Sequence, residues 1–353
     1  MIIFDLHTAL FPYLETTPDG QVFVLVDTQT AVSCLPLVSE AIKGVPFHII
    51  TIPAGESNKS LHTVQHLWDV LFEHHATRQA LLLNIGGGMV TDIGGFVAAT
   101  YMRGIRCMNI PTSLLAMVDA SSGGKTGFNY QGIKNLIGTF TQPLATLIYP
   151  PFLRTLPPAE LLSGYAEMLK HGLIADREHF YALLAALDAE WEDLSSLIAP
   201  SIAIKEDVVS SDFNEKNRRK ILNFGHTIGH AIEEAYAAQS RPVAHGYCVM
   251  WGMVAELYLS VICLGFPREV LSQMSHLMLV NYGRPECDCR QRDQLIEWML
   301  HDKKNLVQEI QPSGLDASIN INFTLLRQIG EPLTDQFVTI DELNEALEYL
   351  FSL

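Results

Sequence analysis

The chain has 353 residues, of which 48% are apolar and 18% are charged, and its formal net charge is −16 at pH 7. This length exceeds the size at which one hydrophobic core stops growing, so we expect two domains, and the low charge content excludes extensive disorder. The acidic balance argues against a broad nucleic-acid footprint, which needs lysine and arginine to neutralise phosphates. An anionic ligand would therefore need a local group of cations.

The N-terminal segment and the cysteines indicate a reducing compartment. The first residues, MIIFDLHTALFPYL, contain Asp5 and no lysine or arginine, so they do not predict a signal peptide, and no later uncharged apolar run is long enough for a membrane span. The six cysteines are scattered, and Cys287 with Cys289 has no second pair or nearby histidine to complete a metal site. We therefore expect a cytoplasmic protein that acts on a small molecule and binds neither nucleic acid nor membrane.

Short β-branched runs alternate with helix-length segments over the first 150 residues. The runs are QVFVLVD (21–27), PFHIITI (46–52), ALLLNIG (80–86), RCMNIPT (106–112) and ATLIYPP (145–151). This alternation predicts βαβ units and a parallel sheet. The runs are almost continuously apolar, which is typical of strands covered on both faces.

The character of the sequence changes near residue 155. Segments 160–175, 195–212, 223–238 and 246–265 have apolar residues at three- and four-residue spacing, which predicts amphipathic helices. One later run, INFTLLRQIG (321–330), is strand-like. We therefore predict an α/β domain over residues 1–155 and an all-α domain over residues 156–353, with a ligand cleft expected at their junction.

A glycine triplet, Gly86, Gly87 and Gly88, lies where the third strand-like run passes into a helical pattern. Three glycines at such a turn let backbone N–H groups approach a pyrophosphate, whose charge the helix N-terminus favours. The pattern differs from the usual dinucleotide fingerprint, G-x-G-x-x-G, so a plain turn is the alternative.

Polar residues follow three other predicted strands. Asp27 ends the first run, where a carboxylate can accept hydrogen bonds from a ribose. Glu56 and Lys59 follow the second run, and Thr112 with Ser113 follows the fourth. Ligands of open α/β sheets bind at this edge, although each residue taken singly is also explained as a helix cap or a turn.

A glutamate and three histidines suggest a metal site in the helical part. Glu167 lies in a helical segment, and a glutamate with two histidines is a known ligand set for catalytic zinc. From spacing alone, His226 and His230, four residues apart on one helix face, are the first guess for two ligands, and His245 is a further candidate. Histidine pairs at this spacing are also common as ordinary helix residues.

Cations stand in or beside these motif-like stretches. They are Lys125, Lys134, Lys170, Lys205, Arg219, Lys303 and Lys304. A phosphorylated acid would need such a group, in which arginine gives bidentate contacts and lysine gives point charges. Any single one of them is also explained as a solvated surface charge.

Taken in order, these stretches resemble the family of 3-dehydroquinate synthases. The quoted motifs are GGGxxxDxGGF (86–96), VDASSGGKT (118–126), GYAExxK (164–170), NFGHTxGH (223–230) and DKK (302–304), and the match runs from about residue 25 to residue 335. The resemblance implies a Rossmann-like N-terminal domain that binds NAD and a helical C-terminal domain that binds zinc or cobalt.

The resemblance also implies roles for single residues. It implies Glu167, His226 and His245 as the metal ligands, so that His230 faces substrate and relays a proton. The other implied catalytic residues are Asp119, Lys125, Lys170, Arg219 and Asn223. The implied substrate-binding residues are Arg103, Asn135, Lys205 and Lys304, with Lys303 as the alternative to Lys304. The implied NAD-binding residues are Asp27, Glu56, Lys59, Gly87, Gly88, Asp92, Thr112, Ser113, Lys134, Phe152, Thr155 and Leu156.

The implied activity converts 3-deoxy-arabino-heptulosonate 7-phosphate to 3-dehydroquinate and phosphate, a lyase step of the shikimate pathway toward chorismate and the aromatic amino acids. NAD is recycled within each turnover, and ring opening precedes an intramolecular aldol closure. Arg103 matches an arginine that reaches the active site of a neighbouring subunit, so a homodimer is expected. The sequence departs from the family pattern at Ser113, where a second threonine is usual, and at Asn217 and Arg218, where glycine and an apolar residue are usual.

Two other enzyme activities and one non-catalytic role fit parts of the pattern. A different sugar phosphate cyclase would share the first steps, but Asn135 and the full GHTxGH stretch favour a carboxylate-bearing substrate. A metal-dependent alcohol or glycerol dehydrogenase would release reduced NAD and would not need so many substrate-facing cations. A catalytically inactive scaffold would have no need to keep the metal set and the lysines.

Overall fold

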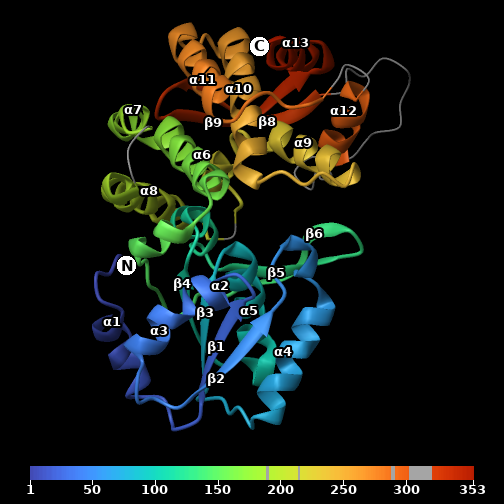
Figure 1. Cartoon of the computed structure of the whole chain (residues 1–353). Coiled ribbons are helices and arrows are strands. Elements are labelled where there is room, and N and C mark those ends of the chain that lie inside the picture. The colour runs from blue at the N-terminus through green and yellow to red at the C-terminus, as the bar shows by residue number, and fades with distance from the viewer. Residues whose placement is uncertain (188–190, 214, 288–290, 302–319) are drawn as a thin grey trace. The chain divides into compact units, whose positions relative to one another are not determined.

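The computed structural model describes residues 1–187, 191–213, 215–287, 291–301 and 320–353 (Figure 1). The chain forms two compact units. The first consists of Met1–Gly164 and Ala189–Glu206, and the second consists of Tyr165–Asp188 and Asp207–Leu353. Each unit has its own core, and each holds part of the predicted site.

The first unit is built on a five-stranded parallel sheet in the order β2-β1-β3-β4-β7. The strands are β1 (Val22–Asp27), β2 (Phe47–Ile52), β3 (Leu81–Gly86), β4 (Arg106–Pro111) and β7 (Ala145–Thr146), so all five predicted runs contain a strand. Strands β1 and β3 are buried along their whole length, as expected for strands covered on both faces. The chain leaves β1 toward β2 on one side and returns to β3 on the other, which makes the carboxyl ends of β1 and β3 a switch point where ligands bind.

Helices and a hairpin complete the first unit. They are α1 (Leu6–Leu14), α2 (Thr30–Ser33), α3 (Leu35–Ala41), η1 (Glu56–Asn58), α4 (Leu61–Glu73), α5 (Gly88–Thr100), η2 (Tyr101–Arg103), η3 (Ala116–Ala120), the antiparallel pair β5 (Lys125–Tyr130) and β6 (Ile133–Phe140), η4 (Pro150–Thr155), the start of α6 (Pro158–Ala175) and most of α8 (Trp191–Ser211). Apolar side chains of α4 and α5, such as Leu67, Ile93 and Val97, pack with Phe23 and Leu82 of the sheet in one buried cluster.

Helix α5 approaches β3 closely because Gly94 has no side chain. Asn84 of β3 is fully buried, and its Nδ2 donates to Asn109 Oδ1 at 2.9 Å and lies 3.1 Å from Cys107 Sγ. A Cβ at Gly94 would lie 2.0 Å from Asn84 Oδ1. The close contact fixes the helix whose first turn follows the glycine triplet.

The second unit is mainly helical, as expected, and it also contains one hairpin. Its elements are the main part of α6 (Pro158–Ala175), α7 (Arg177–Ala185), the end of α8 (Trp191–Ser211), η5 (Arg218–Asn223), α9 (His226–Ala238), α10 (His245–Leu264), α11 (Arg268–Asn281), α12 (Arg292–His301), β8 (Asn320–Gln328), β9 (Glu331–Thr339) and α13 (Ile340–Ser352). The strand-like run at 321–330 lies mostly in β8, which pairs with β9 and packs on α10.

Helix α10 is the central helix of the second unit. Within the described ranges it is the one helix long and apolar enough to cross a membrane, judged by length and composition. However, 67% of its apolar window is buried inside the protein, and it contacts α9, α11, α13 and β8. It also carries Glu256, which is fully buried and accepts hydrogen bonds from α9. These contacts identify α10 as a core helix.

Replacing Gly94 with alanine tests the close approach of α5 to β3. In an unconstrained helix interior this change raises stability by about 1 kcal/mol, because alanine is the better helix former. Here the new methyl group would overlap Asn84 Oδ1, so we expect the free energy of unfolding in urea to fall by about 1–3 kcal/mol. Ala99→Gly, in the same helix, is the control: it measures how far an exchange between alanine and glycine changes the free energy of unfolding through helix propensity. A Gly94→Ala protein as stable as the wild type would contradict the close contact.

Candidate functional site

Glu167 and two histidines converge in the second unit. Glu167, on α6, is fully buried, and its Oε1 lies 3.4 Å from His226 Nε2 and 3.6 Å from His245 Nε2. Ligand atoms that share a tetrahedral zinc ion, with bonds of about 2.0–2.2 Å, lie about 3.3–3.6 Å apart. The three side chains therefore fit one divalent metal ion.

An acceptor holds the far side of each imidazole. His226 Nδ1 lies 3.1 Å from the carbonyl oxygen of Phe224, and His245 Nδ1 lies 3.1 Å from Glu233 Oε2 on α9. Each acceptor favours a proton on Nδ1, so Nε2, which faces Glu167, is the nitrogen that a metal ion would bind. Metal-binding histidines use the same outer contacts to a carbonyl or a carboxylate.

The surroundings of the two histidines differ in charge. Burial lowers the pKa of His226 well below its usual value, and the nearby Lys170 charge acts in the same direction. Burial would also lower the pKa of His245, but the Glu233 and Glu167 carboxylates outweigh it and raise the pKa to about 10. The carboxylates thus favour a positive charge at His245, which a divalent ion would supply.

Lys170 and His230 border the same cluster. Lys170, one turn after Glu167 on α6, is 1% exposed and forms an ion pair with Glu167 Oε2, while Oε1 faces the histidines. The ring centroid of His230 lies 5.2 Å from that of His226 and 5.9 Å from that of His245. One nitrogen of each histidine lies within 4.8 Å of the other two. All three predicted metal ligands and two predicted catalytic residues are therefore neighbours.

Arg219 and Asn223 lie on η5, directly before α9. Arg219 is 2% exposed, and its Nη1 donates to the carbonyl oxygen of Phe213 at 2.7 Å. The preceding loop closes on Asp212, whose carboxylate accepts the backbone N–H groups of Asn217 at 2.6 Å and of Arg219 at 3.1 Å. These bonds, above all the one from Asn217, lower the pKa of Asp212.

The same loop accommodates the departure from the family pattern at 217 and 218. Asn217 has φ −138° and ψ −101°, so this position does not need the positive φ that favours glycine. The side chain of Arg218 is exposed and pairs with Asp207. The loop therefore keeps Arg219 buried without the usual glycine.

The glycine triplet in the first unit leaves the N-terminus of α5 accessible. Gly87 is the N-cap residue of α5, and no side chain caps this helix. A Cβ at Gly88 would lie 3.1 Å from Ala120 Cβ, and one at Gly87 would lie 3.4 Å from Ser113 Oγ. The backbone N–H of Thr112 donates to the Gly86 carbonyl at 3.0 Å. Since side chains would crowd this turn, the glycines fit the binding of an anion such as a pyrophosphate.

Asp27 lies at the end of β1, next to β3 in the sheet. Its Oδ1 accepts the backbone N–H groups of Gln29 and Thr30, each at 2.8 Å, and so shapes the turn into α2. In the part of the chain that the structure describes, Oδ1 makes all the hydrogen bonds of the Asp27 carboxylate. Its other oxygen remains for a ribose hydroxyl, so the turn and the ribose interpretation are compatible.

Lys59 connects three other predicted positions of the first unit. Its Nζ lies 2.6 Å from Asp92 Oδ2, 2.5 Å from Asn135 Oδ1 and 3.9 Å from Glu56 Oε1. Lys59 is 4% exposed, and burial opposes its charge, but the Asp92 and Glu56 carboxylates outweigh burial and raise its pKa. Burial raises the pKa of Asp92 despite the Lys59 charge. Asn135, expected at the substrate, thus contacts Lys59, which is expected at the cofactor.

A second buried ion pair joins Asp119 to Lys205. Lys205 Nζ lies 2.6 Å from Asp119 Oδ1, and the lysine is 6% exposed. The remaining predicted residues of the first unit are Arg103, Lys125 and Lys134, which are exposed, and Phe152, Thr155 and Leu156, which lie in or directly after η4. Lys303 and Lys304 lie outside the described residues.

Glu233 is absent from the predicted site, although it contacts His245. It lies three residues after His230 on α9, so its position on the same helix face is the signal that could have identified it. Its partner His245 is on another helix, and sequence spacing does not show that contact.

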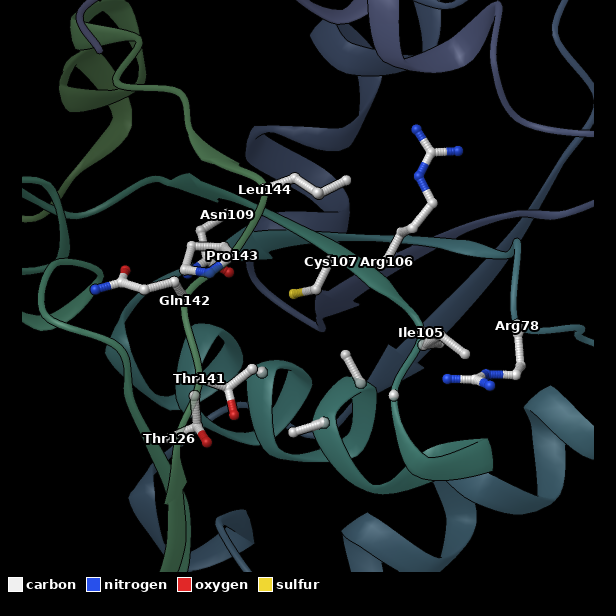
Figure 2. A pocket seen from close by; sticks show the side chains of 14 residues that line it. Arg78, Ile105, Arg106, Cys107, Asn109, Thr126, Thr141, Gln142, Pro143 and Leu144 are labelled. Carbon is white, nitrogen blue, oxygen red and sulfur yellow. The ribbon is translucent and has the colours of Figure 1, made fainter.

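A separate cavity of about 490 Å³ lies in the first unit (Figure 2). Residues of α5, β4 and the segment after β6 line it, and none of the 14 lining residues is a predicted site residue. Arg106 extends away from Thr126 and bonds instead to Thr16 and Thr17. Burial raises the pKa of the Cys107 thiol to about 12, so this thiol is not a nucleophile at neutral pH.

Known proteins match the chain over nearly its whole length. Family models described as 3-dehydroquinate synthase N-terminal and C-terminal match residues 49–163 and 164–305. A 3-dehydroquinate synthase of Parabacteroides distasonis is 43% identical over 348 residues, which cover 98% of this chain and 95% of that protein.

Solved structures of two sugar phosphate cyclases share the fold. A 2-epi-5-epi-valiolone synthase from Streptomyces hygroscopicus, with NAD+ and Zn2+ bound, is 27% identical with a TM-score of 0.85, covering 99% of this chain and 95% of that one. A 2-deoxy-scyllo-inosose synthase complexed with carbaglucose-6-phosphate, NAD+ and Co2+ is 24% identical with a TM-score of 0.82 and the same coverage. The second likeness concerns the fold alone.

Replacing Glu233 with glutamine tests the outer contact to His245. The amide keeps the size of the side chain but removes the negative charge that holds the Nδ1 proton. We expect the affinity for Zn2+ to fall about 10- to 100-fold in competition with a chromophoric chelator. Glu234→Gln, at the exposed next residue of α9, is the matched control and should bind Zn2+ like the wild type. Equal affinities of Glu233→Gln and the wild type would argue against any part for Glu233 in this site.

Proposed function

The chain belongs to the 3-dehydroquinate synthase family, and we propose the roles of its residues in converting 3-deoxy-arabino-heptulosonate 7-phosphate to 3-dehydroquinate and phosphate. It is an NAD- and metal-dependent lyase of the shikimate pathway, and the solved relatives contain NAD+ with Zn2+ or Co2+. The observation that carries the residue assignment is the convergence of two histidine Nε2 atoms on Glu167 Oε1.

Glu167, His226 and His245 are the proposed metal ligands. When bound, the divalent ion would act as a Lewis acid on a substrate alcohol oxygen. Glu167 contributes the anionic ligand, and Lys170 holds its second oxygen in place. His230, on the same helix as His226, is proposed to accept the hydroxyl proton of the substrate alcohol and to return it later.

The carboxyl edge of the parallel sheet is the proposed NAD site. When bound, NAD would take up a hydride from the substrate and return it within the same turnover. The amides after Gly87 would hold the pyrophosphate, and Asp27 would accept hydrogen bonds from a ribose. The other residues proposed for this site are Glu56, Lys59, Gly88, Asp92, Thr112, Ser113, Lys134, Phe152, Thr155 and Leu156.

In each unit taken by itself, cations and amides are proposed to bind the anionic substrate. Lys125, Asn135 and the pair of Lys205 with Asp119 belong to the first unit, and Arg219 with Asn223 belongs to the second. Buried cations stabilise the charge that develops on the leaving phosphate more strongly than solvated ones, because less water competes for them. Lys205 and Arg219, at 6% and 2% exposure, meet this condition. A role for Lys304 stays a prediction.

Sequence identity favours dehydroquinate formation over the related cyclisations. The dehydroquinate synthase relative is 43% identical, whereas the valiolone- and inosose-forming enzymes are 27% and 24% identical. The valiolone- and inosose-forming enzymes share the fold of this chain, so the fold alone does not select among the sugar phosphates. The substrate assay below distinguishes them.

We also propose that the chain acts in the cytoplasm as a homodimer, with Arg103 reaching the active site of the partner. Met102 and Arg103 support this proposal because both are exposed and have left-handed backbones, with φ 50° and 65°. Such conformations cost about 1–3 kcal/mol each in a non-glycine residue, persist only where the surrounding structure holds them, and cluster at functional sites.

Phosphate release is the direct test of the activity. Purified protein given 3-deoxy-arabino-heptulosonate 7-phosphate and NAD should release phosphate without accumulating NADH, since the hydride returns to the substrate. Chelation should abolish the release, and Zn2+ or Co2+ should restore it. Accumulating NADH would indicate a dehydrogenase instead, and release only from another sugar phosphate would indicate a different cyclase.

Complementation between two inactive variants tests the role of Arg103. Arg103→Ala and His226→Ala should each have little activity alone. If Arg103 acts in the partner's site, each mixed dimer has one complete site, so co-expression in equal amounts should restore about a quarter of the wild-type turnover. A mixture no more active than the separate variants would show that Arg103 does not act in the partner's site.

A further inference from the structure

Glu256, on α10, connects this helix to the first residues of α9. The glutamate is fully buried, although carboxylates are rarely buried without partners. Its Oε2 accepts the backbone N–H of Gly225 at 2.5 Å, and its Oε1 accepts those of Thr227 and Ile228 at 3.1 and 3.2 Å. Thus the amides directly before and directly after His226 are both bound by one carboxylate.

The start of α9 needs such an external acceptor. Its N-cap residue, Gly225, has φ 79° and no side chain, so the amides of the first turn have no local capping group. A Cβ at this position would lie 2.4 Å from Met253 Cγ on α10, which excludes a serine or an aspartate as the usual cap. The neighbouring helix therefore supplies the acceptor.

Glycines allow α10 to reach this turn. A Cβ at Gly252 would lie 2.0 Å from the Gly225 carbonyl oxygen and 2.7 Å from Gly229 N, and one at Gly229 would lie 2.9 Å from the Cys248 carbonyl oxygen. The two backbones are thus in direct contact beside Glu256. The helix N-terminus and three amide donors offset the cost of burying the carboxylate.

We propose that Glu256 is a positioning residue for the metal ligand His226. Its Oε2 binds the N–H of the Phe224–Gly225 peptide, whose carbonyl oxygen faces His226 Nδ1, and its Oε1 binds the N–H of the His226–Thr227 peptide. These bonds hold the backbone and the imidazole of His226 in place. Glu256 bonds to backbone amides and acts on the metal through His226. The inference rests on the proposed metal ligands.

Glu256→Gln tests the proposal because glutamine has one acceptor oxygen, and its NH2 group would face a backbone N–H. We expect the Zn2+ affinity to fall about 10- to 100-fold, as for other outer contacts of metal ligands. The visible absorption spectrum of the Co2+-loaded variant should change as well, because it reports the ligand geometry and not the stability of the fold.

Ser260→Ala is the matched control. Ser260 lies one turn later on α10, is fully buried, donates to the Glu256 carbonyl oxygen at 2.7 Å and accepts the Leu326 N–H at 3.0 Å. Its loss should lower the unfolding temperature but leave the Zn2+ affinity and the Co2+ spectrum unchanged. Wild-type affinity and spectrum in Glu256→Gln, or equal losses of affinity in both variants, would overturn the proposal.

Hydrogen exchange of the wild-type protein, after a chelator has removed its metal, tests the bonds between Glu256 and the amides. This experiment does not depend on whether a variant folds. The amides of Gly225, Thr227 and Ile228 should be protected before any metal is added, because the carboxylate already binds them. Protection that appears only with Zn2+ would overturn the proposal. A wild-type protein that binds no Zn2+ would overturn the metal ligands and this inference together, whereas unaffected binding in Glu256→Gln would overturn this inference alone.

Discussion

The backbone contact between α9 and α10 determines where two of the three proposed metal ligands lie. His226 is the first residue of α9 and His245 is the first residue of α10, so both imidazoles project from helix N-termini. Helix N-termini carry partial positive charge and by themselves disfavour a cation. The carboxylates of Glu167, Glu233 and Glu256 supply the opposing charge, and each bonds to a histidine or to the amides beside one.

The first unit depends on a different constraint, the reversal of strand order at β1 and β3. It places the end of β1, with Asp27, beside the glycine turn after β3, and Gly94 holds α5 against the sheet. Two buried lysines here are already paired, Lys59 with Asp92 and Lys205 with Asp119. A ligand that enters such a network exchanges one polar partner of the lysine for another.

The sequence was sufficient to predict the five parallel strands and the helical character of the second unit, but not the two antiparallel hairpins or the contacts between elements. Continuous apolar runs located the five parallel strands because strands buried on both faces leave that pattern. The contacts of Lys59 join residues 33 and 76 positions apart, and no local pattern encodes such distances. Helical spacing paired His226 with His230, whereas the pairing of His226 with His245 around Glu167 depends on the packing of three helices. Glu256 lies in an apolar helix, and its role becomes visible only through amides about 30 positions away.

A crystal structure of the Zn2+-loaded protein, with anomalous scattering measured at the zinc edge, would test the central claim most directly. The account predicts one strong peak, bonded to Glu167 Oε1, His226 Nε2 and His245 Nε2 at about 2.0–2.2 Å, with His230 outside the coordination shell. A zinc ion held by His226 and His230 without His245, or bound away from Glu167, would contradict it.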